Sequence, residues 1–332
     1  MSGQPALLQH DMFPGIFDCI LDYASRDVLF AFRATCRTNR DRVDARISRH
    51  LSLWLIDDST MLSTPGDQRV PALRSPGPGE DPKAASIARR RALGLTRILD
   101  YNLEPHFASL PDQETMDGLC NVQTVRHWSG HTRQTYPISF PTYIEFVNMH
   151  CRAEIWAGQM RWRQPPECEA ELAQEGVRRW IVNARYQTRD TGLASAIIQL
   201  VVQPAAAETL REMVILVTEH SYGGYKRSHD APPPPPQYGM LQSVIERIAS
   251  TLPNIQYTLV LDDKFNPVWF GLPEETSPEQ FRTAVAQAVL NEVSRDKTES
   301  ELLRAMDAFQ LMSLEEYQSH VGNQQFELQT LG

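Results

Sequence analysis

The spacing of apolar residues changes several times along the chain, and each spacing predicts a different kind of element. In residues 8–56 apolar positions recur at intervals of about three or four, which is typical of helices with one buried face. Residues 58–88 are rich in Ser, Pro, Gly and charge, which predicts a linker or loop. Over residues 90–272, short β-branched runs predict strands separated by turns and helices. Residues 276–322 return to a helical spacing.

The predicted strands share a short run of aliphatic or aromatic residues. They are 95–101, 122–128, 142–149, 178–186, 196–202, 212–219 and 256–263. Helices are predicted between some of them, over 168–176 and 239–251. Strands that alternate with helices indicate a largely parallel sheet. The fold class is therefore α/β or α+β, with a small helical unit in front and helices at the end.

Three of these strands begin with one local pattern, in which apolar residues lie three positions apart. The clearest copies are Leu119/Val122/Val125, Val177/Trp180/Val182 and Leu210/Met213/Ile215. This rhythm is typical of a leucine-rich repeat, whose inward residues fill a stacked core. The copies are irregularly spaced and lack the usual Asn or Cys. A degenerate leucine-rich-repeat-like solenoid and an ordinary doubly wound domain both remain open.

Three capping signatures predict the C-terminal helices. They are Ser277 with Gln280, Thr298 with Glu301, and Ser313 with Glu316. Apolar residues at helical spacing follow the first two signatures and predict the faces that turn to a core. These residues are Phe281, Val285 and Val289, and then Leu302, Ala305 and Phe309.

The N-terminal stretch "FPGIFDCILDYASRDVLFAFRATCRTNR" predicts two short helices. Pro14 suits a first helical turn, and Asp27 suits the N-cap of the second helix. The nearby arginines also permit a DNA-reading helix pair, but Asp27, Asp41 and Asp44 dilute their charge. A third interpretation is that the apolar stripe simply packs under the following domain.

This stretch resembles an F-box, whose pattern is Leu-Pro, an amphipathic helix, an Asp-Leu-Leu-type turn, and a helix ending in a Cys-Arg-rich segment. The resemblance is strongest over Phe13–Arg40 and points to F-box-like proteins of an expanded fungal family. The segment Leu311–Leu331 also looks like the closing segment of such proteins. Two positions depart from the pattern: Phe13 replaces Leu, and Asn39 stands where the family often has Trp or another apolar residue.

The resemblance implies docking onto the Skp-type linker subunit of a Skp–cullin–F-box ubiquitin ligase. A helix-in-groove contact with apolar anchors is expected. The matching positions are Phe13, Pro14, Ile16, Ile20, Leu21, Val28, Leu29, Phe32 and Cys36. Some of them must instead hold the helical unit together. The rest of the chain would recruit an unknown protein substrate, and the protein itself would be a non-enzymatic adaptor.

A proline-rich loop over residues 228–238 is a second candidate for partner binding. Its end, Pro235-Pro236-Gln237-Tyr238, reads as PPxY, a type of sequence that WW domains bind. Consecutive prolines hold a polyproline II conformation, which is a low-entropy ligand for aromatic grooves. The plainer interpretation is a stiff surface loop.

The composition bears on three further properties of the protein: nucleic-acid binding, cellular compartment and membrane association. The net charge of −9 disfavours nucleic-acid binding, which needs clustered Lys and Arg. Five cysteines without a CxxC pair indicate free thiols in a reducing compartment, the cytoplasm or nucleus. No stretch approaches the roughly 20 apolar residues of a membrane span, so no membrane association is expected.

Enzyme chemistry and metal binding have weak candidates. Carboxylates follow several predicted strands, at Asp100, Glu219 and the pair Asp262-Asp263. In a doubly wound sheet such acids would line a ligand crevice, so a metal-dependent α/β enzyme using Asp262 and Asp263 is an alternative. Acids at strand ends are also routine turn residues. We expect no enzyme activity, no cofactor and no metal site. A further alternative to the adaptor is a protein-interaction scaffold without ligase association.

Overall fold

The structure, a computed structural model, divides into two units. It describes residues 14–56, 59–65, 68–70, 73, 78–79, 81–102, 112–128, 138–148, 153–156, 159–162, 168–186, 198–219, 242–252, 254–262, 267, 272–273, 275–295 and 298–331. Unit 1 comprises Met1–Leu99 and Pro111–Asn121, and unit 2 comprises Asp100–Leu110 and Val122–Gly332.

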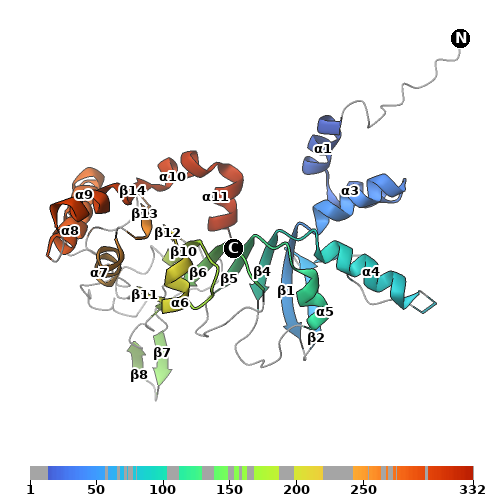
Figure 1. The fold of residues 1–332 in the computed structure, drawn as a ribbon, viewed down its shortest axis with the longest axis horizontal. Helices are drawn as coiled ribbons and strands as arrows, with labels where there is room; N and C mark the ends of the chain where they lie inside the picture. The colour runs from blue at the N-terminus through green and yellow to red at the C-terminus, as the bar shows by residue number, and fades with distance from the viewer. Residues whose placement is uncertain are drawn as a thin grey trace, which may run out of the picture. The chain divides into compact units, whose positions relative to one another are not determined.

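Unit 1 begins with three short helices and continues into strands (Figure 1). The helices are α1 (Pro14–Tyr23), α2 (Arg26–Arg33) and α3 (Arg37–Ile47). The strands are β1 (His50–Ile56), β2 (Ser59–Thr64) and β3 (Gln68–Arg69), which pair antiparallel in that order. Two further helices are α4 (Pro82–Leu93) and α5 (Gln113–Gly118).

The helical prediction for residues 50–56 is wrong, because these residues form β1. Leu51 and Leu53 alternate with more polar neighbours, and both side chains are fully buried. This two-residue period is that of a strand. The predicted linker at 58–88 is also partly regular, since β2 pairs with β1 and the carboxylate of Asp81 caps α4 by accepting from Lys83 N at 3.0 Å.

Unit 2 contains a run of parallel strands whose spatial order is their order along the chain. The strands are β5 (Thr124–Trp128), β6 (Thr142–Asn148), β10 (Arg179–Tyr186), β12 (Glu212–Glu219), β13 (Gln256–Leu261) and β14 (Phe309–Ser313). Each pairs parallel with the next. The order from β5 to β14 never reverses, as in a solenoid, whereas a doubly wound sheet has a switch point. Strand β4 (Ile98–Asn102) lies at the division between the units.

Short strands outside this run correct one prediction and bear out another. β7 (Ala153–Trp156) and β8 (Gln159–Trp162) form an antiparallel pair, and β9 (Cys168–Leu172) pairs parallel with β11 (Ile198–Val202). The helix predicted over 168–176 is therefore wrong at its start. The letters "CEAEL" alternate apolar and acidic residues, which is the period of a strand. The predicted strand 196–202 exists, but it pairs with β9 in a separate sheet.

One face of the parallel strands, which we call the core face, carries the residues of the repeat-like pattern. Val125, Tyr143, Trp180, Met213 and Tyr257 lie directly opposite one another across five strands, and all are buried. In-register rows of inward side chains are what a repeat of this rhythm is expected to stack. The α/β fold class is thus confirmed.

Unit 2 has six described helices, and three of them, α8, α9 and α10, begin at capping boxes. The six helices are α6 (Pro204–Thr209), α7 (Gln242–Thr251), α8 (Pro278–Ser294), α9 (Glu299–Asp307), α10 (Leu314–Val321) and α11 (Asn323–Thr330). Ser277 and Ser313 complete capping boxes with Gln280 and Glu316. Phe309, expected on a helix, begins β14 instead, because it pairs with Tyr257 of β13.

The opposite face of the parallel strands, which we call the tail face, is covered by α10 and α11. Its apolar residues are Ile144, Phe146, Ile181, Val214, Leu216 and Val260, which form one cluster with Tyr317 of α10. In Figure 1, α10 and α11 run along one side of these strands, and α6 and α7 lie on the other side. The end of the chain therefore packs against strands that precede it by many residues.

Candidate functional site

Ion pairs tie the three N-terminal helices together. Arg33 on α2 approaches Asp44 on α3 with Nε 2.5 Å from Oδ1 and Nη2 3.2 Å from Oδ2. Arg46 on α3 reaches back to α1, where Nη1 lies 3.6 Å from Asp18 Oδ1 and Nη2 pairs with Asp22. Partly exposed ion pairs contribute little energy each, so their main effect is to orient the helices.

The interior of this helical unit uses part of the predicted partner-binding set. Leu21 is buried, with 3% of its surface exposed. The rings of Phe17 on α1 and Phe32 on α2 stack with centroids 6.0 Å apart and an angle of 28° between planes. Leu29 is half-buried. Leu21 and Phe32 therefore serve the packing of the helices themselves.

Other members of the predicted set point to solvent. Ile16, Ile20 and Val28 are each 52% exposed. Ile16 and Ile20 lie four residues apart and so share one side of α1. Cys36 is exposed at the N-cap position of α3. Single exposed apolar residues are ordinary, but these belong to a small unit whose internal contacts are made by other side chains.

Three further positions of the F-box-like comparison are Phe13, Pro14 and Asn39. Pro14 is the first residue of α1, and Phe13 lies outside the described residues. Asn39 on α3 is half-buried, and its Nδ2 donates to Thr35 Oγ1 at 2.8 Å. The amide thus makes a local bond where the family often places an apolar side chain.

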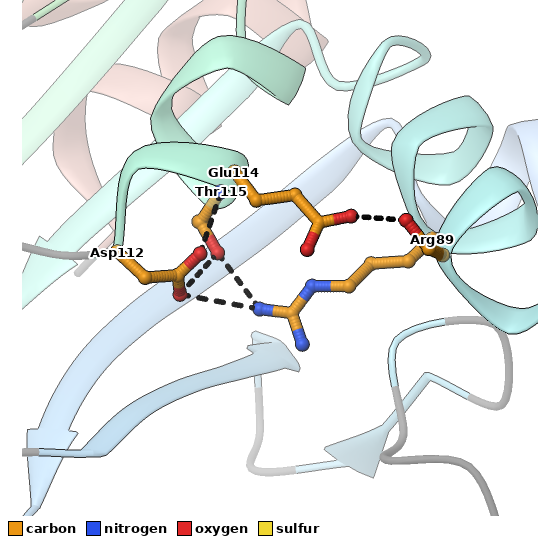
Figure 2. Close-up of polar contacts among 5 residues, drawn as sticks. Arg89, Asp112, Glu114 and Thr115 are labelled. Atoms are coloured by element: carbon orange, nitrogen blue, oxygen red, sulfur yellow. Dashed lines mark hydrogen bonds and ion pairs between the residues drawn. The ribbon is translucent and has the colours of Figure 1, made fainter. Parts of the chain in front are cut away.

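A polar cluster joins α4 to α5 (Figure 2). Arg89 Nη2 donates to Thr115 Oγ1 at 2.7 Å, and Asp112 accepts from Thr115 N at 2.8 Å and from its Oγ1 at 2.7 Å. Ser86 Oγ donates to Glu114 Oε1 at 2.5 Å. Burial raises the pKa of Asp112, but the bonds from Thr115 and the charge of Arg89 outweigh it, so the pKa lies below its ordinary value. Most of these groups bond one another, which fits a structural role, and Arg89 Nε is the buried atom that has no hydrogen-bond partner among the described residues.

The tail face carries a group of polar and aromatic residues that we call the arginine–aromatic cluster: Arg126, Trp128, Phe146, Asn183 and Arg185. The guanidinium carbon of Arg185 lies 4.4 Å from the centroid of the Phe146 ring, and that of Arg126 lies 5.2 Å from it. Trp128 stacks on Phe146 with centroids 5.0 Å apart. Both arginines are buried, so cation–π contacts here are stronger than at an exposed site.

The polar groups of the cluster are held by buried partners. Arg126 Nε lies 3.3 Å from Asp100 Oδ1, and both side chains are less than a tenth exposed. Burial lowers the pKa of Arg126, and the charge of Asp100 opposes that shift. Asn183 Oδ1 accepts from Thr218 Oγ1 at 2.7 Å. The Asn183 amide is therefore oriented with its nitrogen available to a further acceptor.

Those donors all meet the end of α11. They bond three consecutive main-chain carbonyls: Asn183 Nδ2 to Gln329 at 2.8 Å, Arg185 Nη2 to Thr330 at 2.9 Å, and Arg126 Nη2 to Leu331 at 2.7 Å. The last carbonyls of a helix have no partner within it and carry the negative end of its dipole. Two arginines and an amide are well matched to that acceptor group.

The core face has its own buried polar pairs. Trp180 Nε1 donates to Glu145 Oε2 at 3.2 Å, and Tyr143 Oη lies 3.1 Å from His127 Nδ1. Burial lowers the pKa of His127 to about 4. The imidazole is consequently neutral at physiological pH. The imidazole packs beside the ring of Tyr143.

Among the strand-end acids, the structure describes contacts of Asp100 and Asp262. Asp100 pairs with Arg126. Asp262 follows β13, and its main-chain nitrogen donates to Val217 O at 3.3 Å. Asp263 lies outside the described residues, and so does the loop with Pro235, Pro236 and Tyr238. Among the residues that the structure describes, no group of three or more His, Cys, Asp or Glu side chains could hold a metal ion.

Sequence reasoning missed the arginine–aromatic cluster, although a signal for it is present. "IVNARY" places Asn183 and Arg185 two residues apart inside a buried strand, and "TVRHW" places Arg126 within another. Residues two apart in a strand share a face. Polar residues on one face of an otherwise apolar strand are rarely left without a partner, and that partner here is the end of the chain.

Comparison with known proteins adds no relative. No protein-family model matches the chain, and neither does any curated protein or solved structure. Among the described residues, no helix combines the length and the apolar character needed to cross a membrane.

Proposed function

We propose that the protein is a non-enzymatic, F-box-like adaptor. In this proposal α1 and α2 dock onto the Skp-type linker subunit of a cullin–RING ubiquitin ligase, and the rest of the chain recruits a protein substrate. The support from sequence is the resemblance over Phe13–Arg40. The observation that carries the proposal is that Ile16, Ile20 and Val28 are each about half exposed, while Leu21 and Phe32 make the internal contacts.

These exposed side chains have the chemistry of a docking surface. Interface cores are apolar and depleted of charge, and a helix-in-groove contact reads one side of the helix. Ile16 and Ile20 offer such a side on α1, and Val28 adds an apolar residue on α2. The ion pairs of Arg33 and Arg46 hold the helices in a fixed arrangement before any partner binds, which lowers the entropic cost of binding.

The test is co-purification of the full chain with a Skp-type linker protein. Wild type is compared with the double variant Ile16→Asp/Ile20→Asp, which leaves the Phe17–Phe32 stack intact. Burying one Ile contributes about 1.5–3 kcal/mol, so the double variant should weaken capture more than about a hundredfold. Ile87→Asp is the matched control, since Ile87 on α4 is 62% exposed and belongs to the same unit.

Capture by wild type and Ile87→Asp, but not by the double variant, supports the adaptor function. Equal capture of all three, or no capture of wild type, contradicts it. The second candidate is a protein-interaction scaffold without ligase association. Asn39 favours it, because an amide bonded to Thr35 replaces the apolar contact that the family pattern expects.

The proposed partner places the protein in the cytoplasm or nucleus. Cys19, Cys36 and Cys120 are exposed free thiols, which is the usual state of cysteine in these reducing compartments.

A further inference from the structure

The two faces of the parallel strands are covered in different ways. On the core face, α7 contributes Thr251, whose hydroxyl meets the Tyr257 hydroxyl. On the tail face, the cover is the last part of the chain, α10 and α11. Its half-buried apolar residues Leu314, Val321, Phe326 and Leu328 pack against the cluster centred on Phe146 and Leu216.

The contact between α11 and the sheet resembles that of a bound ligand, because several side chains of the sheet bond one end of the helix. The arginine–aromatic cluster belongs to β5, β6 and β10, and its three donors converge on three consecutive carbonyls of α11. These bonds go to main-chain atoms, so they read the end of a helix and not a particular side chain. Gly322, with φ of 81°, makes the turn between α10 and α11, a conformation that favours glycine.

The fit of this internal helix is incomplete. Tyr317 Oη donates to Gln329 Oε1 at 2.8 Å, but Gln329 Nε2 is buried and has no hydrogen-bond partner among the described residues. A buried donor without an acceptor is unfavourable. A different helix that places an apolar residue at this position would avoid that cost while keeping the three carbonyl bonds.

We infer that the arginine–aromatic cluster is a docking site for the C-terminal end of a short helix, which α11 occupies in the free protein and a helix of a partner protein takes by displacing it. The partner helix ends on three free carbonyls and presents aromatic or aliphatic side chains toward Trp128 and Leu216. Its negative dipole end is complementary to Arg126 and Arg185. The inference goes beyond the proposed linker contact and is independent of it, because it concerns unit 2 alone.

Hydrogen exchange on the wild-type full chain tests whether α11 can leave. A displaceable helix opens locally, so the amides of α11 should exchange at least about tenfold faster than those of β10 and β12, which open only with the fold. Equal protection of α11 and β10 would show that α11 is a fixed part of the core, and would overturn the inference.

Binding of a probe helix in trans tests whether the site accepts another chain. The probe is a fluorescent peptide of residues 312–332 with an amidated C-terminus. Phe326→Asp in the full chain weakens the internal helix, so this variant should bind the probe at least about tenfold more tightly than wild type, since affinity scales with the fraction of open sites. Gln324→Asp is the matched control, because Gln324 lies on the same helix and is exposed.

A second peptide assigns binding to the carbonyl-reading donors. It comprises residues 312–327 and lacks the three carbonyls, so it should bind at least about tenfold more weakly. The inference is overturned if a folded Phe326→Asp variant does not bind the probe. It is also overturned if both peptides bind with equal affinity. If circular dichroism shows that Phe326→Asp is unfolded, wild type is titrated with the two peptides instead. Weak binding that needs residues 328–332 supports the site, and no such binding contradicts the inference.

Discussion

The carbonyl oxygen of Gln329 accepts a 2.8 Å hydrogen bond from Nδ2 of Asn183, a residue 146 positions earlier in the chain. Asn183 also accepts from Thr218 Oγ1 on the neighbouring strand. One buried amide thus links β10, β12 and the last helix. Since Asn183 and Gln329 are both fully buried, neither can turn to water if the other is removed.

Asn183→Ala should lower the free energy of unfolding by about 1–3 kcal/mol, because the change leaves the Gln329 carbonyl and the Thr218 hydroxyl without their partner. Urea unfolding followed by circular dichroism measures this difference. Gln324→Ala is the control, because Gln324 is exposed on α11, and it should change the free energy by less than about 0.5 kcal/mol. Equal stability of Asn183→Ala and the control would mean that the amide is not part of what holds α11.

Trp180→Phe tests the buried pair on the core face. Phe keeps most of the ring but removes the Nε1 donor that lies 3.2 Å from Glu145 Oε2, so the free energy of unfolding should fall by about 1–3 kcal/mol. The same substitution at Trp54, which is 38% exposed on β1, should have little effect. Thermal unfolding of both variants makes the comparison, and equal shifts would argue against a stabilising role for the Trp180–Glu145 bond.

Elements with a strong local signal could be predicted from the sequence. β-branched runs predict β5, β6, β10, β11, β12 and β13, and the capping boxes at Ser277 and Ser313 mark helix starts through contacts within four residues. Segments with two compatible periods were assigned wrongly. "LSLWLI" and "CEAEL" suit a helix by composition but alternate like a strand, and pairing with β2 and β11 decides between them.

The candidate sites could be predicted only in part, because contacts distant along the chain decide them. The F-box-like pattern named Leu21 and Ile20 together, and only the packing of α1 against its neighbours separates the buried residue from the exposed one. Arg126 and Arg185 lie on different strands, and their shared ligand is the end of the chain. No local spacing carries that information.

His127 should make stability depend on pH. Burial lowers its pKa from the ordinary 6.5 to about 4, so between these values the unfolded chain binds a proton that the folded protein does not. The contribution is complete above about pH 6.5 and is lost as the pH falls toward about 4, with a total on the order of 3 kcal/mol. His127→Asn cannot take up this proton, so its stability should fall less steeply over that range.

Urea unfolding of wild type and His127→Asn between about pH 4.5 and pH 7 measures the two slopes. His320→Asn is the control, because His320 is exposed on α10, and it should keep the wild-type slope. An unchanged slope in His127→Asn would show that the imidazole takes up its proton equally in the folded and the unfolded protein.

Gly118 should not tolerate a side chain, because α4 and α5 approach each other closely at this point. A Cβ at Gly118 would lie 2.7 Å from the Cβ of Leu93, which is fully buried. Gly118→Ala should therefore lower the free energy of unfolding by about 1–3 kcal/mol, as overpacking does.

Gly15→Ala is the control, since no atom lies within 4 Å of its added Cβ. On α1 this change should be neutral or stabilising by up to about 1 kcal/mol. The double variant Gly118→Ala/Leu93→Gly should lose less stability than the sum of its single changes, because the second substitution removes the Cβ, Cγ and Cδ1 atoms that the first would meet. If the losses in free energy of unfolding measured with urea are additive, the side chains at the two positions do not clash.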